Sequence, residues 1–236
     1  MATTPRERAR AQTMADITRI GRAHLAEYGA AALSLRAVAR DLGVVSSAVY
    51  RYVKSRDELL TLLLVDGYDD LGDTVARALA AVPEASHRER FVAFGHAIRT
   101  WARAEPATYA LLYGAPVPGY HAPAEQTTGP GTRVVRMLLE LAAAALADGA
   151  LDVPAQPGAV PPGLAAAFEG VREQFGIDLP DDALVAGVLV WAGLFGCVSF
   201  EVFGQYGPEG FGGDAEDLFA RHLALLADSL GIGVSR

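Results

Sequence analysis

The stretch that decides the fold is residues 34–60, SLRAVARDLGVVSSAVYRYVKSRDELL. Gly43 can adopt the left-handed backbone of a tight turn between helices, and Ala39 is small enough to let a second helix approach the first. The apolar positions expected to form a small shared core are Val38, Leu42, Val44, Val49 and Val53. This pattern predicts two short helices, at about 35–42 and 47–53, joined as a helix-turn-helix.

Hydroxyl side chains ahead of the apolar runs predict where these helices begin. Ser34 is expected to cap the first short helix and Ser46 the second. Ser55 with Glu58 three residues later has the form of a capping box, so a long helix is expected from there to about Ala81.

The outward positions of the second short helix carry side chains suited to DNA. Short side chains at its start would let the helix approach base edges in the major groove, while phenol hydroxyls and cations would meet phosphates. The expected DNA-facing residues on this helix are Ser46, Ser47, Ala48, Tyr50, Arg51 and Tyr52. Lys54 and Arg36 are expected to contact the phosphate backbone, and 6–10, with three arginines, is expected to be a disordered arm along the DNA.

The charge is distributed unevenly along the 236 residues. Residues 1–56 hold ten basic and four acidic side chains, whereas the remainder holds ten basic and twenty-four acidic ones. This distribution favours a small basic module that meets a polyanion, attached to an acidic body that does not. A solvated charged face is the alternative explanation.

Helical periodicity continues through the rest of the chain, and no stretch shows sustained strand alternation. The fold class is therefore expected to be all-α, with a helix-turn-helix domain over 1–56 and a larger helical effector-binding and dimerisation domain over 57–236. Segments 114–130 and 149–163 are rich in Gly and Pro and are expected to be loops. Further helices are expected at about 87–104, 106–113, 131–148, 162–175, 181–203 and 214–230.

The segment AVYRYVKSRDELL at 48–60, with the turn before it, resembles the TetR family of bacterial transcription regulators over residues 11–65. The resemblance implies a homodimeric, ligand-responsive repressor that binds an inverted-repeat operator in double-stranded DNA. By position, it implies that DNA is contacted by Arg36, Ser46, Ser47, Ala48, Tyr50, Tyr52, Lys54 and Arg56. Leu35 stands where relatives often have a phosphate-contacting Thr.

The acidic body has features that suit dimerisation. Ala192, Gly196 and Ser199 share one face of the helix expected at 181–203, and an apolar face follows at 214–230. Two such helices from each subunit would form a four-helix interface. The uncharged run 183–200 is close to the length of a membrane span, but no Lys or Arg flanks it, so we expect a buried helix and no membrane.

The same region resembles a C-terminal subclass with a Trp, His and Gly pattern, in which Phe195 here replaces the His. That replacement favours a small, largely apolar effector. Packing in the core is the alternative role for each aromatic candidate. The candidate ligand-binding residues are Trp101, Tyr109, Tyr113, Tyr120, His121, Phe168, Trp191 and Phe195.

Signatures of catalysis are not apparent. The five histidines and the single Cys197 show no metal-ligand spacing, and no nucleotide-binding or nucleophile motif appears, so we expect no enzyme, no metal and no cofactor. An all-α enzyme or a protein-binding module with a purely structural helix-turn-helix stays open as an alternative. The N-terminal residues hold no apolar signal segment, and one cysteine cannot form an internal disulfide, so a cytoplasmic location is expected.

Overall fold

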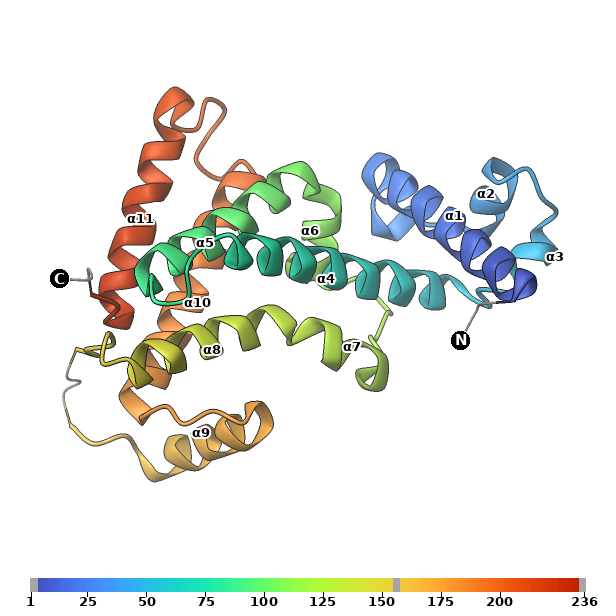
Figure 1. Cartoon of the computed structure of the whole chain (residues 1–236). Coiled ribbons are helices and arrows are strands. Elements are labelled where there is room, and N and C mark those ends of the chain that lie inside the picture. The colour runs from blue at the N-terminus through green and yellow to red at the C-terminus, as the bar shows by residue number, and fades with distance from the viewer. Residues whose placement is uncertain (1–3, 155–157, 234–236) are drawn as a thin grey trace. The chain divides into compact units, whose positions relative to one another are not determined.

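A computed structural model describes residues 4–154 and 158–233 of the chain (Figure 1). These residues form helices and loops with no β-strand, apart from one isolated bridge between Leu151 and Ile232. The expected all-α class is therefore confirmed. The helices are α1 (Pro5–Tyr28), α2 (Leu35–Asp41), α3 (Ser46–Val49), α4 (Arg56–Ala80), α5 (His87–Ala104), α6 (Pro106–Tyr113), α7 (Ala124–Gly131), α8 (Arg133–Ala147), α9 (Pro162–Phe175), α10 (Asp181–Val202) and α11 (Ala215–Leu230), with 3₁₀ turns η1 (Ala30–Ala32) and η2 (Gly212–Asp214).

The chain packs into two compact units. The first unit comprises Met1–Asp70 and Ala104–Gly131, and the second comprises Leu71–Arg103 and Thr132–Arg236. These units follow the proximity of the backbone segments, whereas the division expected between residues 56 and 57 is one of function and stays a prediction.

The core of the first unit lies among α1, α2, α3 and the first half of α4. Gly21 allows α1 to approach α4 closely, because a Cβ there would lie 3.0 Å from Leu63 Cδ2. The buried apolar side chains that fill this core are Ile17, Ile20, Leu25, Leu33, Leu35, Val38, Ala39, Val49, Val53, Leu59, Leu60 and Leu63. The two-helix core expected from the sequence is thus part of a larger cluster.

Several local predictions for the first unit are wrong. Residues 6–10 are not a disordered arm but lie in α1, whose start is fixed by a capping box between Thr4 and Glu7. Val44 is 40% exposed rather than inward, because the turn after Gly43 carries it outward. Ser46 is the first residue of α3 and not its cap, and α3 ends at Val49.

Residues 124–131 form α7 although their composition predicts a loop. The carbonyl of Pro123 accepts hydrogen bonds from the backbone N–H groups of Gln126 and Thr127 at 3.0 and 3.1 Å, and from the Thr127 hydroxyl at 2.9 Å. These local bonds start the helix. Pro130 has no N–H to donate to the carbonyl four residues earlier, and the helix ends one residue after it, at Gly131. The segment expected as a loop at 149–163 includes residues outside the described ranges, and α9 begins within it at Pro162.

Gly43 has the positive φ of +73° that the turn between α2 and α3 requires. Replacing it by Ala is expected to lower the free energy of unfolding by about 1–2 kcal/mol, because a Cβ disfavours the left-handed backbone. No neighbour lies within 4 Å of that Cβ position, so the effect would be purely conformational. Gly129→Ala, in α7 and equally open, is the control and should cost nothing; chemical denaturation measures both.

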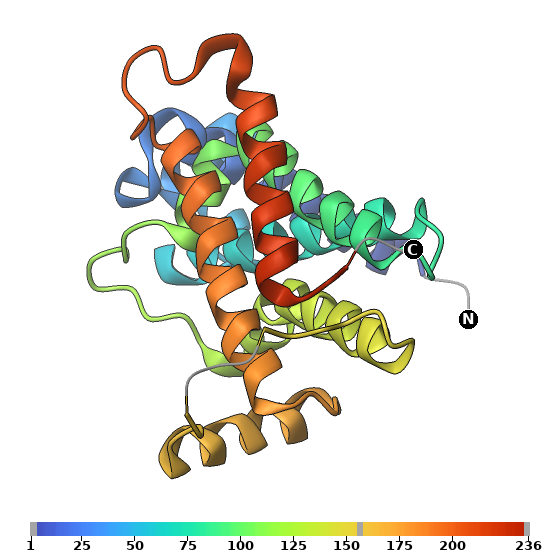
Figure 2. The same ribbon diagram turned by 90° about the vertical axis from the view of Figure 1, so that its left-hand side faces the viewer.

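The second unit is organised around the pair α10 and α11, which run side by side (Figure 2). Leu223 of α11 is fully buried and packs onto Gly95 of α5, where a Cβ would lie 2.3 Å from Leu223 Cδ2. Phe219 and Leu223 belong to the apolar face expected at 214–230 for dimerisation, but both are buried in the unit's own core.

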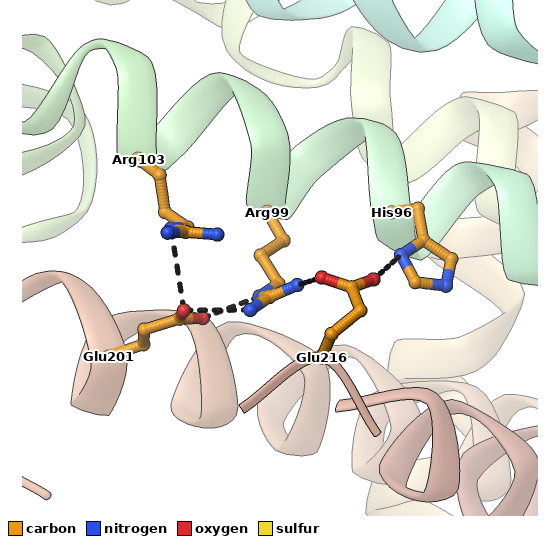
Figure 3. A network of polar contacts seen from close by, with 5 residues as sticks. All are labelled: His96, Arg99, Arg103, Glu201 and Glu216. Atoms are coloured by element: carbon orange, nitrogen blue, oxygen red, sulfur yellow. Dashed lines mark hydrogen bonds and ion pairs between the residues drawn. The ribbon is translucent and has the colours of Figure 1, made fainter. Parts of the chain in front are cut away.

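An ion network around the buried Arg99 joins α5 to the end of α10 and the start of α11 (Figure 3). The Arg99 guanidinium, 3% exposed as a residue, donates to both carboxylate oxygens of Glu201, at 2.6 and 2.8 Å, and also to Glu216. Arg99 lowers the pKa of Glu216 by donating to it. Arg103 lies 3.4 Å from Glu201, and His96 lies 3.3 Å from Glu216. The network fixes the position of the loop between α10 and α11 at both ends.

Candidate nucleic-acid interface

The buried side of the second short helix fixes which residues face outward. Val49 and Val53 are each 1% exposed and anchor the segment to the core of the first unit. Ser47, Tyr50 and Arg51 are consequently exposed, with Tyr50 at 41%. Because α3 has only four residues, the chain turns immediately after Val49 and Tyr50 lies just beyond the helix. Hydroxyl, phenol and guanidinium groups are therefore presented together.

Three residues expected on the outward face are only partly exposed. Ser46 and Ala48 are half-buried at the head of α3. Tyr52 packs against the core of the first unit, and the Arg10 guanidinium carbon lies 5.4 Å from the centre of its ring. The ring of Tyr52 thus packs on the protein side of the interface, which leaves its hydroxyl group to contact DNA.

The cationic side chains near α3 differ in whether they are bonded within the protein. Arg36 and Lys54 have exposed side chains, and the Lys54 backbone N–H donates to Glu58 at 2.5 Å. Arg56 donates instead to the carbonyl oxygens of Ala30 and Ala31, at 2.9 and 3.3 Å. The guanidinium of Arg56 therefore holds η1 against the start of α4.

A polar contact that sequence patterns did not reveal ties α1 to the helix-turn-helix. Nε2 of His24, a buried residue, lies 2.6 Å from the Asp41 carboxylate at the end of α2. Contacts with His24 and Arg40 hold the pKa of Asp41 below its ordinary value. The only sequence signal for this pair is a histidine on the apolar face of an amphipathic helix, which does not identify its partner.

The aromatic residues expected to bind ligand divide between the two units. In the first unit, the ring centres of Tyr109 and Tyr113 lie 5.3 Å apart. The ring of Tyr68, a residue that the sequence analysis did not identify, lies 6.2 Å from that of Tyr113. Burial raises the pKa of Tyr113. The Tyr120 hydroxyl lies 2.9 Å from the Thr61 hydroxyl. His121 is exposed.

In the second unit, Phe168 and Trp191 line one apolar cavity of about 180 Å³ among α8, α9 and α10. Phe195 does not line it but stacks on Trp191, with ring centres 4.3 Å apart. Trp101 is buried in α5 and is not among the lining residues. The lining residues that sequence analysis missed are Val135, Leu138, Leu139, Val171, Phe175, Leu184, Gly187 and Val188. Aliphatic residues at helical spacing carry no signal that separates cavity walls from core.

α10 is long and apolar enough to span a membrane by length and composition alone, and 39% of its apolar window is buried within the protein. Among the described residues, no three His, Cys, Asp or Glu side chains gather as metal ligands. Burial raises the pKa of the Cys197 thiol, so its reactive thiolate is disfavoured.

Family models match both halves of the chain. Residues 17–63 match the model described as bacterial regulatory proteins of the tetR family. Residues 91–226 match the model described as the C-terminal domain of tetracyclin repressor-like proteins.

Individual relatives agree with these matches. The chain is 50% identical over 204 residues to the HTH-type transcriptional regulator Rv1816 of Mycobacterium tuberculosis and to Mb1846 of Mycobacterium bovis, covering 86% of each chain.

Among solved structures, SCO4313, described as a regulatory protein, is 33% identical with a TM-score of 0.76 over 95% of this chain and all of that one. PfmR of Thermus thermophilus, a TetR family regulator at 14% identity and a TM-score of 0.55 over 94% of this chain and 99% of its own, shares the fold. The chain therefore belongs to the TetR family of DNA-binding transcription regulators and is not an enzyme.

Proposed function

We propose that the protein is a cytoplasmic, ligand-responsive repressor that binds an inverted-repeat operator as a homodimer. The observation that carries this proposal is the exposed set Ser47, Tyr50, Arg51 and Lys54, presented by α3 and the segment directly after it, whose other side is buried. In this proposal, residues 1–56 bind DNA, with half-sites read in successive major grooves about one helical turn or more apart.

The other residues expected to contact DNA are given roles according to the exposure and hydrogen bonds of their side chains. Arg36 and Lys54 would contact phosphates, because both are exposed cations near the ends of the two short helices. Ser46, Ala48 and Tyr52 would contribute their exposed atoms at the edge of the interface. Arg56, engaged with two carbonyl groups, is assigned a positioning role with at most a secondary phosphate contact.

Dimerisation is assigned to an exposed apolar stripe on α10. Val188 and Leu189 are 62% and 60% exposed, although each is a large aliphatic residue. Helical steps of three and four residues continue this face to the end of the helix. The stripe consists of Val188, Leu189, Ala192 and Phe200 on α10 and Phe203 directly after it. On α11, Leu225 is also exposed, at 64%. A second copy would cover such a surface and pair α10 and α11 with their counterparts.

The effector is assigned to the cavity among α8, α9 and α10. Its lining is entirely apolar or aromatic, so a charged ligand would lose hydration without gaining a partner. A small, neutral, apolar molecule suits it. Effector binding would shift the equilibrium between two arrangements of the dimer. The size of the shift is set by the difference between the effector's affinities for the two arrangements.

A mobility-shift titration against the DNA upstream of the protein's own gene tests the proposal. Wild-type protein should bind, and Tyr50→Ala or Lys54→Ala should weaken binding about tenfold or more without changing the circular-dichroism spectrum. Glu173→Ala, at an exposed position on α9, is the matched control and should bind normally. Binding that neither variant changes, or that is insensitive to salt, would refute the proposed interface.

Filling the cavity should abolish the response to effector. Gly187 lines the cavity, and no atom lies within 4 Å of a Cβ placed there, so Gly187→Leu can start a side chain into the cavity without a clash at its Cβ. Apolar ligands that change Trp191 fluorescence in the wild type should lose about tenfold or more in affinity for this variant. DNA binding without ligand should be unchanged. An unaltered ligand titration would show that the effector binds elsewhere.

A further inference from the structure

Among the described residues of the first unit, the one just before the recognition helix has the most exposed large apolar side chain. Val45 is 71% exposed, and Val44 beside it is 40% exposed. Both valines lie in the turn between α2 and α3, where the Val45 carbonyl accepts a hydrogen bond from the Ala48 backbone N–H at 2.9 Å. Together they form a small apolar patch at the head of the recognition helix.

Val45 also breaks a local rule. It is the N-cap of α3, a position where Ser, Thr, Asp or Asn accepts a hydrogen bond from the first helical turn, and α3 has no side-chain cap. A valine there forfeits about 1 kcal/mol of capping and gains no burial in return. Positions where local preference and packing are both unsatisfied tend to be functional ones.

The surroundings of the patch indicate which surface covers it. Exposed cations lie on both sides of it, Arg36 and Arg40 on α2 and Arg51 and Lys54 after α3, which suits a polyanion. The N-terminal end of a recognition helix is the part that meets base edges in the major groove. On those edges, the one apolar group is the 5-methyl of thymine.

We propose that Val45, flanked by Val44, contacts the 5-methyl group of a thymine in each operator half-site and so determines specificity at that base pair. This inference rests on the proposed operator binding and adds the identity of one base. Val45 lies beside Ser46 and Ser47, whose hydroxyls can read neighbouring polar positions.

The test is a double-mutant cycle between the protein side chain and the DNA methyl group. An operator is first selected from a random library with wild-type protein, and each thymine of one half-site is then replaced in turn by deoxyuridine, which lacks only the methyl. At one thymine, wild-type binding should weaken about fourfold, as expected for one buried methyl group. Val45→Ala should bind the thymine and deoxyuridine operators equally.

Lys54→Ala is the matched control, because loss of a phosphate contact should weaken binding to both operators while preserving the fourfold difference. Since Val45 is exposed, Val45→Ala should keep the wild-type unfolding midpoint, which calorimetry verifies. The inference is overturned if no thymine responds to deoxyuridine, or if Val45→Ala still discriminates. Failure of the wild type to select any DNA would overturn the proposed operator binding itself, and with it this inference.

Discussion

Replacing Leu189 by Glu is expected to convert the protein from a dimer to a monomer. Leu189 is 60% exposed in the single chain, so the substitution should not disturb folding. In the proposed interface, two unpaired carboxylates would be buried for each dimer, at a cost of several kcal/mol. The dimer dissociation constant should rise about a hundredfold or more, and operator affinity should fall with it, because a monomer reaches only one half-site. Sedimentation velocity measures the dissociation constant directly.

Leu164→Glu provides the matched control for this prediction. Leu164 lies on α9 and is not part of the stripe, with 41% of its surface exposed, and its substitution should leave the oligomeric state unchanged. A Leu189→Glu protein that remains a dimer at micromolar concentration would show that another surface joins the subunits.

Replacing Arg99 by Met should lower the free energy of unfolding by about 3 kcal/mol. Methionine can fill the space of the aliphatic stem, but Glu201 would lose two hydrogen bonds from a buried guanidinium and keep only the longer contact with Arg103. Glu201 has only 20% of its side chain exposed, so its charge is poorly compensated by water. Denaturant unfolding followed by circular dichroism gives the value.

Arg103→Met separates the effect of burial from the effect of charge. This substitution removes the same type of cation from the same network. The Arg103 side chain, however, is 56% exposed, and its guanidinium lies 3.4 Å from Glu201. The expected loss is about 0.5 kcal/mol. Adding Glu201→Gln to Arg99→Met should restore part of the lost stability. Equal losses for the two arginine variants would contradict the structural role assigned to Arg99.

Local signals in the sequence predicted much of the helical framework. Pro106 and Pro162 stand at the first positions of α6 and α9, and both helices were predicted with the bounds that the structure shows. Gly43, predicted to take the left-handed conformation, does so. Such features depend on a few neighbouring residues, so a single sequence is sufficient to recognise them.

Features that depend on distant contacts were not predictable in the same way. The partner of His24 is Asp41 in another helix, and no periodicity links the two residues. Composition failed at α7, where the carbonyl of Pro123 starts a helix in a segment rich in Gly and Pro. Aromatic type marked Tyr109 and Phe168 as candidates for a ligand pocket, with core packing as the alternative. Both are buried, but the sequence did not indicate that they lie in different compact units.

The central claim is that the exposed side of residues 45–54 enters the major groove of each half-site. A cleavage reagent attached at Ser47→Cys, in a Cys197→Ala background, tests it directly on the selected operator. We predict two clusters of strand cleavage, one in each half-site and related by the operator's two-fold symmetry, and none from the same reagent at Glu173→Cys. Cleavage scattered along the DNA, or stronger from position 173 than from position 47, would contradict the account.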